Sequence, residues 1–137
     1  SVRGGDTRRG DPVQQKKFLI VDDNRQICDV VADMLSPTGA QIVTAFNGTD
    51  ALSVLEKGPL DLAIVDLLFG GPVSSEFVVH LARLKNCPVI TMSGTLASDR
   101  RGRDLATPHL AKPFRADELV SLVEKTLNQR GHPAVLL

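Results

Sequence analysis

Five polar side chains could together carry out phosphoryl-transfer chemistry: Asp22, Asp23, Asp66, Ser93 and Lys112. Three carboxylates in one pocket cannot all stay ionised without a counter-charge. Mg²⁺ meets that need, because it prefers oxygen ligands, binds through one or two carboxylates and keeps positions open for water and phosphate. A lysine adds a point charge for an anion, a serine adds a hydroxyl donor, and Asp66 would be the nucleophile that forms an acyl phosphate.

Each of these residues follows a short apolar run typical of a buried strand. Ile64 and Val65, for example, are β-branched and come directly before Asp66. Any one of these acids alone would be read as a strand-end or helix-capping aspartate. Their placement at several strand ends favours a shared site instead. The five predicted strands are residues 18–21, 41–46, 60–66, 87–92 and 109–111.

Apolar residues at helical spacing lie between these strands. Asn24 is a predicted cap of the first helix, and Ser74 or Ser75 of the third. The apolar residues expected to point the third helix at the sheet are Phe77, Val78, Leu81 and Leu84. The second helix ends at Gly58 and Pro59, and the last one begins near Ala116.

Five strand–helix repeats predict an α/β fold, the flavodoxin-like doubly wound arrangement, with a five-stranded parallel sheet of order 2-1-3-4-5 and five helices. The fourth helix is expected to be short or frayed, because residues 94–107 are rich in charge and poor in apolar surface. In such a sheet the carboxyl ends of strands one and three are neighbours. Asp22, Asp23 and Asp66 should therefore converge, with Lys112 and Ser93 on the same edge.

These residues in this order resemble the receiver domain of two-component response regulators. The resemblance implies that Asp66 accepts a phosphoryl group from a sensor histidine kinase or a histidine phosphotransfer protein. It further implies that Asp22, Asp23, Asp66 and the main-chain carbonyl of Leu68 hold Mg²⁺. Lys112 would contact the phosphate and precede a cis peptide bond to Pro113. Ser93 would move to the phosphoryl oxygens, and the signal would pass by protein–protein contact to a downstream protein target.

The sequence departs from the receiver pattern at several places. Phe69, Gly70 and Ser74 occupy the positions after the acceptor where receivers usually have Met, Pro and Gly. His109 stands where the switch aromatic is usual, so it is either a switch residue or a semi-exposed strand histidine. Gly94 after Ser93 would leave the phosphoryl group open to donors and water. The short spacing between Ser93 and Lys112 is the second reason to expect an abbreviated fourth helix.

Composition limits the other functions. Lys plus Arg and Asp plus Glu are both 16, so no global field favours nucleic acid or a membrane, and we expect direct binding to neither. The two cysteines, Cys28 and Cys87, are expected to be reduced core thiols of a cytoplasmic protein. No run of about 18 apolar residues is present. We expect a flexible flank at residues 1–15, a receiver domain at 16–129 and a tail at 130–137, whether the chain stands alone or is cut from a larger regulator.

Three alternatives remain. A receiver-like scaffold that acts without phosphorylation would account for the unusual loop after Asp66. An aspartate-nucleophile phosphatase of the haloacid type needs a second acid two residues after the nucleophile, where this chain has Leu68. A flavin carrier of the same fold is disfavoured, because Asp22 and Asp23 would repel a flavin phosphate.

Overall fold

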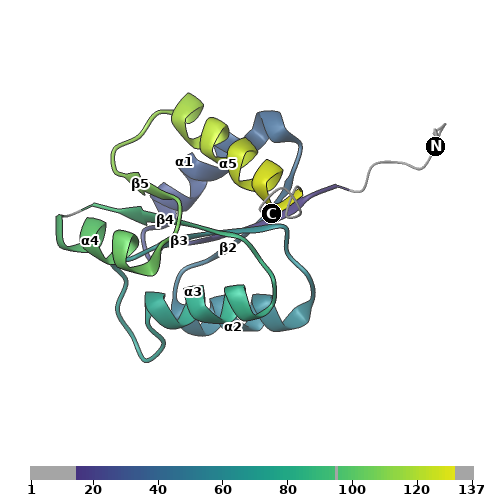
Figure 1. Ribbon diagram of the computed structural model, residues 1–137. Helices are drawn as coiled ribbons and strands as arrows, with labels where there is room; N and C mark the ends of the chain where they lie inside the picture. The colour runs from purple at the N-terminus through teal and green to yellow at the C-terminus, as the bar shows by residue number, and fades with distance from the viewer. Residues whose placement is uncertain (1–14, 95, 132–137) are drawn as a thin grey trace, which may run out of the picture.

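The computed structural model describes residues 15–94 and 96–131. Within them, five strands alternate with five α-helices (Figure 1). The strands are β1 (Lys17–Val21), β2 (Gln41–Ala45), β3 (Leu62–Asp66), β4 (Val89–Ser93) and β5 (His109–Ala111). The helices are α1 (Arg25–Leu35), α2 (Gly48–Lys57), α3 (Ser75–Leu84), α4 (Leu96–Leu105) and α5 (Ala116–Gly131), and a 3₁₀ turn (Ser36–Thr38) follows α1.

The strands form one parallel sheet in the order β2-β1-β3-β4-β5, which confirms the predicted doubly wound topology. Figure 1 shows α1 and α5 together on one face of this sheet, and α2 and α3 together on the other. Parallel neighbours end at the same edge, so every β–α connection starts there. This edge collects the residues that follow the strands.

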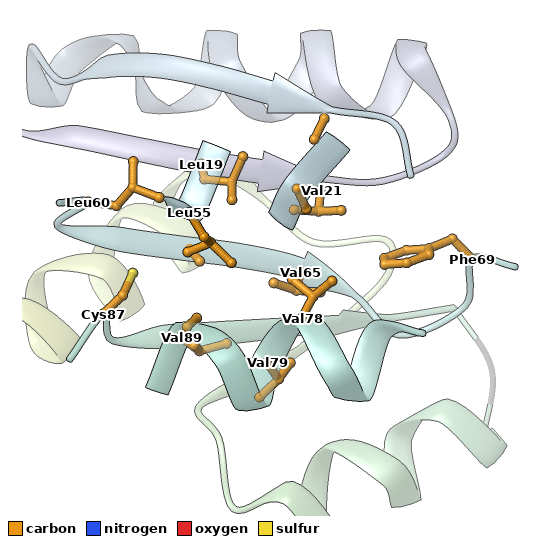
Figure 2. Packing of buried hydrophobic residues seen from close by; sticks show 14 of the residues in the cluster. Leu19, Val21, Leu55, Leu60, Val65, Phe69, Val78, Val79, Cys87 and Val89 are labelled. Atoms are coloured by element: carbon orange, nitrogen blue, oxygen red, sulfur yellow. The ribbon is translucent and has the colours of Figure 1, made fainter. Parts of the chain in front are cut away.

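Successive residues of β1 enter two different cores, because side chains alternate across a strand. Phe18 and Ile20 belong to the core under α1 and α5, and Leu19 and Val21 to the core under α2 and α3. Figure 2 shows the second core, where Val65 of β3 lies close to Val78 of α3. A central strand buried on both faces reads as a continuous apolar run, which is why β1 and β3 are recognisable in the sequence.

Side-chain caps fix where the helices begin. The Asn24 side chain accepts hydrogen bonds from the backbone N–H groups of Gln26 and Ile27, as predicted. Of the two serines considered for α3, Ser74 is the cap, and it accepts from the Phe77 N–H. These caps set the first helical residue directly after each loop.

The predicted inner face of α3 is wrong in two positions. Phe77 and Leu84 were expected to point at the sheet, but they are 52% and 72% exposed. The inward face is a second regular stripe, formed by Ser75, Val78, Val79 and Ala82. Its smaller side chains let the helix approach the sheet closely. The Phe77 and Leu84 side chains lie on the outside as a result.

The fourth helix is not abbreviated. α4 has ten residues, the same number as α2 and α3. The short spacing between Ser93 and Lys112 is absorbed by the connections instead. Ala106 adopts a left-handed conformation (φ 56°), which makes a tight turn into β5. Strand β4 also differs slightly from the prediction, since it runs through Ser93 and begins after Pro88.

Parts of the predicted flanks lie outside the described residues, namely 1–14 of the N-terminal flank and 132–137 of the tail. Helix α5 continues through Gly131, into the segment expected to be tail. Cys28 and Cys87 are buried in opposite cores, as expected of core thiols. None of the helices in the described ranges combines the length and the apolar character that crossing a bilayer requires.

Candidate functional site

Two buried aspartates lie side by side because their strands are neighbours. Asp66 is the last residue of β3, and Asp22 directly follows β1, whose Val21 is in register with Val65. Asp22 is 1% exposed and Asp66 3%, whereas Asp23 is exposed. One carboxylate oxygen from each of the three acids lies within 4.8 Å of the other two. The structure therefore brings the three predicted acids together at the carboxyl edge of the sheet.

Lys112 supplies the counter-charge from the other side of β4. It directly follows β5, and its backbone N–H donates to the Ser93 carbonyl at 2.6 Å. The peptide bond from Lys112 to Pro113 is cis, as the resemblance implied. The Lys112 Nζ atom lies 2.8 Å from Asp22 Oδ2 and 3.0 Å from Asp66 Oδ1. One ammonium therefore bridges the two buried carboxylates.

The charges of this cluster shift the pKa values of its members. Burial raises the pKa of Asp66; the Lys112 ammonium opposes this shift, and the negative charge of Asp22 adds to it. Burial alone would lower the pKa of Lys112, but its contacts with Asp22 and Asp66 outweigh that effect and raise it. The lysine is thus firmly protonated. Asp66 is a carboxylate held in surroundings that do not fully compensate its charge.

One buried oxygen of the cluster has no hydrogen bond to the described residues. Asp66 Oδ2 accepts from the Leu68 N–H at 3.2 Å, and Asp22 Oδ1 accepts from the Asn24 N–H at 2.9 Å. Asp66 Oδ1 is buried without a hydrogen-bond partner among the described residues, since the nearby ammonium approaches outside hydrogen-bond geometry. A buried, underused carboxylate oxygen can still accept a cation or form a bond. Three carboxylates against one ammonium leave a net negative charge, which suits a hard divalent cation.

Ser93 and His109 are joined by a hydrogen bond that links β4 to β5. Ser93 Oγ lies 2.7 Å from His109 Nε2, and Thr91 Oγ1 lies 2.6 Å from His109 Nδ1. Thr91 also contacts Thr107 through the two hydroxyl oxygens, at 2.7 Å. The imidazole is therefore held on both nitrogens and turned inward. Ser93 stands at the site edge with its hydroxyl engaged by the histidine.

Thr91 and Gly102 were not singled out by sequence reasoning. Thr91 is fully buried, in register with His109, and on the same side of β4 as Ser93. A polar residue two positions before Ser93 was the available signal, because side chains repeat every second residue along a strand. Gly102 packs its backbone against the imidazole, and a Cβ added there would lie 2.7 Å from His109 Cε1. Nothing in the sequence alone points to that contact.

The unusual loop after Asp66 is anchored at two places. Phe69 is buried (8% exposed), and Figure 2 shows its ring turned back toward Val65 and Val78. Farther along the loop, Val73 lies directly against the backbone of Gly48 at the start of α2. Leu68, between Asp66 and Phe69, has an exposed side chain. The loop thus has its own packing, although it lacks the usual Met-Pro pair.

Fold and site together define a protein with a buried aspartate cluster and a bridging lysine at the carboxyl edge of a doubly wound sheet. Comparison with known proteins gives the class a name. The family model for the response regulator receiver domain matches residues 18–124. The chain belongs to this family, whose members are signalling switches of two-component systems.

Individual relatives agree with this family. The chain is 32% identical over 119 residues to sporulation initiation phosphotransferase F of Bacillus subtilis, covering 84% of this chain and 96% of that protein. It is 25% identical over 123 residues to the regulatory protein VanRc of Enterococcus gallinarum, covering 83% of this chain and 51% of that protein. Several of the curated relatives are thus about twice as long as the matched segment.

A solved structure shows the same fold. The response regulator protein TrrA of Thermotoga maritima, in complex with Mg²⁺-BeF, is 30% identical and superimposes with a TM-score of 0.72. The match covers 82% of this chain and 99% of that chain.

Proposed function

We propose that this chain is a phosphoacceptor receiver, in which Asp66 takes a phosphoryl group from a phosphohistidine. The donor would be a sensor histidine kinase or a histidine phosphotransfer protein. The observation that carries the proposal is the Asp66 carboxylate, buried, with one oxygen lacking a hydrogen bond and a lysine ammonium 3.0 Å away. The name of the Bacillus subtilis relative, a phosphotransferase, supports the same chemistry.

In the proposed step, an Asp66 carboxylate oxygen forms a bond to phosphorus while the phosphorus–nitrogen bond of the phosphohistidine breaks. The bonding electron pair stays with the imidazole nitrogen of the donor, and Asp66 becomes an acyl phosphate. Lys112 can contact the negatively charged phosphoryl group on Asp66, since its ammonium already lies between Asp22 and Asp66. Beyond providing the nucleophile, the protein contributes mainly by positioning the reacting groups and neutralising their charge.

Asp22, Asp23, Asp66 and the main-chain carbonyl of Leu68 would hold Mg²⁺. The ion would neutralise the phosphoryl oxygens and offset the negative charge of the cluster. The chain's own contribution is to fix these oxygens. Asp22 is held by the Asn24 N–H, and Asp66 by the Leu68 N–H.

Phosphorylation would be read out through Ser93 and His109. To reach a phosphoryl oxygen on Asp66, the Ser93 hydroxyl must give up its present bond to His109 Nε2. The imidazole would then lose the contact at Nε2 and could leave the inward position. We propose that this change alters the β4–β5 surface and is recognised by a downstream protein target.

The donor protein would contact an apolar groove beside the site. This groove has a volume of about 360 Å³ and adjoins Lys112. Val30, which is 47% exposed, lies on its α1 wall. A donor must bring its histidine ring to the buried Asp66, so the surface around that ring must cover this region. The other lining residues are Ile27, Val31, Met34, Gly94, Pro113 and Phe114.

Intact-mass measurement tests the proposal. The protein is incubated with Mg²⁺ and a small acyl or amido phosphate, and one added phosphoryl group is expected. The adduct should be absent in Asp66→Asn and unchanged in Asp29→Asn, which alters an exposed carboxylate on α1. An adduct that persists in Asp66→Asn would place the acceptor elsewhere. No adduct from any donor, with Mg²⁺ bound, would favour the scaffold that acts without phosphorylation.

A further inference from the structure

Hydrogen bonds connect four polar side chains in a row behind the candidate site, in the order Ser93, His109, Thr91 and Thr107. Ser93 Oγ lies 2.7 Å from His109 Nε2, and Thr91 Oγ1 lies 2.6 Å from His109 Nδ1. The Thr91 and Thr107 hydroxyl oxygens are 2.7 Å apart. Each of these short contacts needs one hydrogen between its two heavy atoms. The row therefore has a direction, which is set by which atom donates at each contact.

Two main-chain carbonyl groups determine that direction. Thr91 Oγ1 lies 3.4 Å from the Pro108 oxygen, and Thr107 Oγ1 lies 3.4 Å from the Gly102 oxygen. A carbonyl oxygen can only accept, and each hydroxyl has a single hydrogen to donate. If Thr91 donated to His109 Nδ1, Thr107 would have to donate to Thr91, and neither carbonyl would receive a hydroxyl hydrogen from this pair. If either threonine donates to its carbonyl, Thr91 must instead accept from Nδ1.

Both arrangements that use a carbonyl acceptor thus place the imidazole hydrogen on Nδ1. A neutral imidazole carries one N–H, so Nε2 of His109 is then an acceptor. The short contact at Nε2 must in that case use the Ser93 hydrogen. Ser93 has only one hydroxyl hydrogen, so it cannot donate to the ring and to a phosphoryl oxygen at the same time. The tautomer of His109 therefore decides whether Ser93 can donate toward Asp66.

We propose that Thr91 is a positioning residue for the phosphoryl group on Asp66. Its hydroxyl holds His109 in the Nδ1–H tautomer, and this tautomer keeps the Ser93 hydrogen on the ring. Thr91 is fully buried and acts through the imidazole, and the inference rests on the proposed function of Asp66. Thr91 thus opposes the phosphorylated arrangement, in which Ser93 donates to a phosphoryl oxygen. Releasing that hydrogen requires the ring either to leave or to carry hydrogen on Nε2.

Nitrogen-15 NMR of the imidazole tests the tautomer in the unphosphorylated protein. Spectra are recorded at about pH 8.5, above the range in which imidazoles usually titrate, and the signals missing in His109→Gln identify the ring. We expect hydrogen on Nδ1 in the wild type. A wild-type ring with hydrogen on Nε2 would overturn the proposal without the need for any variant of Thr91.

Two substitutions of Thr91 test its effect on the ring. Thr91→Val keeps the branched shape but removes the hydroxyl, so a hydrogen on Nδ1 would lose this acceptor. Nε2–H can still donate to the Ser93 oxygen, and the nitrogen signals should therefore shift toward the Nε2–H tautomer. Thr91→Ser restores a hydroxyl and should restore Nδ1–H. An unchanged tautomer in Thr91→Val would reject the role of Thr91.

Beryllofluoride, a mimic of the phosphoryl group, tests the effect on the site. With Mg²⁺, Thr91→Val should bind it about two- to tenfold more tightly than the wild type, which is the range for one neutral hydrogen bond. Fluorine-19 NMR measures the bound fraction, and circular dichroism shows that each variant is folded. Thr126→Val is the matched control, because it removes another buried threonine hydroxyl, which donates to the Leu122 carbonyl. It should leave the affinity unchanged.

The outcomes separate this inference from the proposed function. If Thr91→Val changes the affinity no more than Thr126→Val does, the role of Thr91 is rejected while Asp66 remains the acceptor. If the wild type binds no beryllofluoride, Asp66 is rejected as the acceptor, and with it a role of Thr91 in that step. The nitrogen signals of His109 would still decide the tautomer in that case.

Discussion

The imidazole of His109, on β5, lies directly against the backbone of Gly102, on α4. This contact fixes the ring between Thr91 and Ser93. Position 102 therefore requires glycine because a side chain would overlap the imidazole, and not because of its backbone conformation.

Replacing Gly102 by Ala should destabilise the protein by about 1–3 kcal/mol, because the added methyl group overlaps the imidazole. Helix propensity alone predicts the opposite sign, a gain of about 1 kcal/mol. The chain has no Trp or Tyr, so urea unfolding is best followed by circular dichroism. Gly58→Ala is the control, since no atom lies within 4 Å of an added Cβ there. A stabilised Gly102→Ala variant would show that the ring moves away freely.

Replacing Lys112 by Met should lower the free energy of unfolding by about 1–3 kcal/mol without Mg²⁺, because Asp22 and Asp66 lose their shared counter-charge. Breaking a fully buried ion pair lowers the free energy of unfolding by more than this, but the Lys112 side chain is 22% exposed. Added Mg²⁺ should restore part of the loss. Mg²⁺ should stabilise Lys57→Met, on the surface of α2, less than it stabilises Lys112→Met, because the Lys112 ammonium still neutralises the carboxylates there. Equal stabilisation of both variants by Mg²⁺ would contradict this role of Lys112.

Replacing Asp66 by Asn should stabilise the protein at neutral pH by about 1–2 kcal/mol without Mg²⁺. The pKa of Asp66 is raised on folding, so the folded state binds the proton more tightly than the unfolded state. Stability should therefore fall as the pH rises from the usual pKa of 3.8 through the raised value. The difference in unfolding free energy between wild type and Asp66→Asn should change in the same direction as the pH rises above 3.8. A difference in unfolding free energy that does not change with pH would contradict the raised pKa of Asp66.

The Cys28 thiol should be inert in the folded protein. Burial, followed by the negative charge of Asp22, raises the pKa of Cys28 to about 11. At pH 8 the thiolate fraction is then about a hundredfold lower than in an unfolded chain. Labelling with a thiol reagent, mapped by mass spectrometry, should reach Cys28 only in urea. Rapid labelling of Cys28 in the native protein would show that its surroundings open.

Much of the site was predictable because its residues stand at the ends of apolar runs. The strand before Asp66 is buried on both faces, and such a run is visible in the sequence. Parallel topology then brings Asp22, Asp66 and Lys112 to one edge. The convergence of these side chains follows from strand order alone.

The parts that could not be predicted depend on packing between elements. Helix α3 has two regular stripes, and the sequence does not say which one faces the sheet. The stripe with Val78 and Ala82 fits closely, so Leu84 faces outward. The predicted length of α4 was wrong because the short spacing between Ser93 and Lys112 was attributed to the helix. In the structure, the left-handed conformation of Ala106 makes the turn after the helix short instead. The contact of Gly102 with His109 is likewise a property of the folded chain.

The close approach of Gly48 to Val73 couples two segments that are far apart in the sequence. A Cβ added at Gly48 would lie 2.7 Å from the Val73 Cβ, so no other residue fits there without displacing the loop. The loop that follows Asp66 is thus shaped partly by a residue on α2. Anyone building a chimera that transplants residues 67–74 from another receiver would need to exchange the residue at position 48 with them.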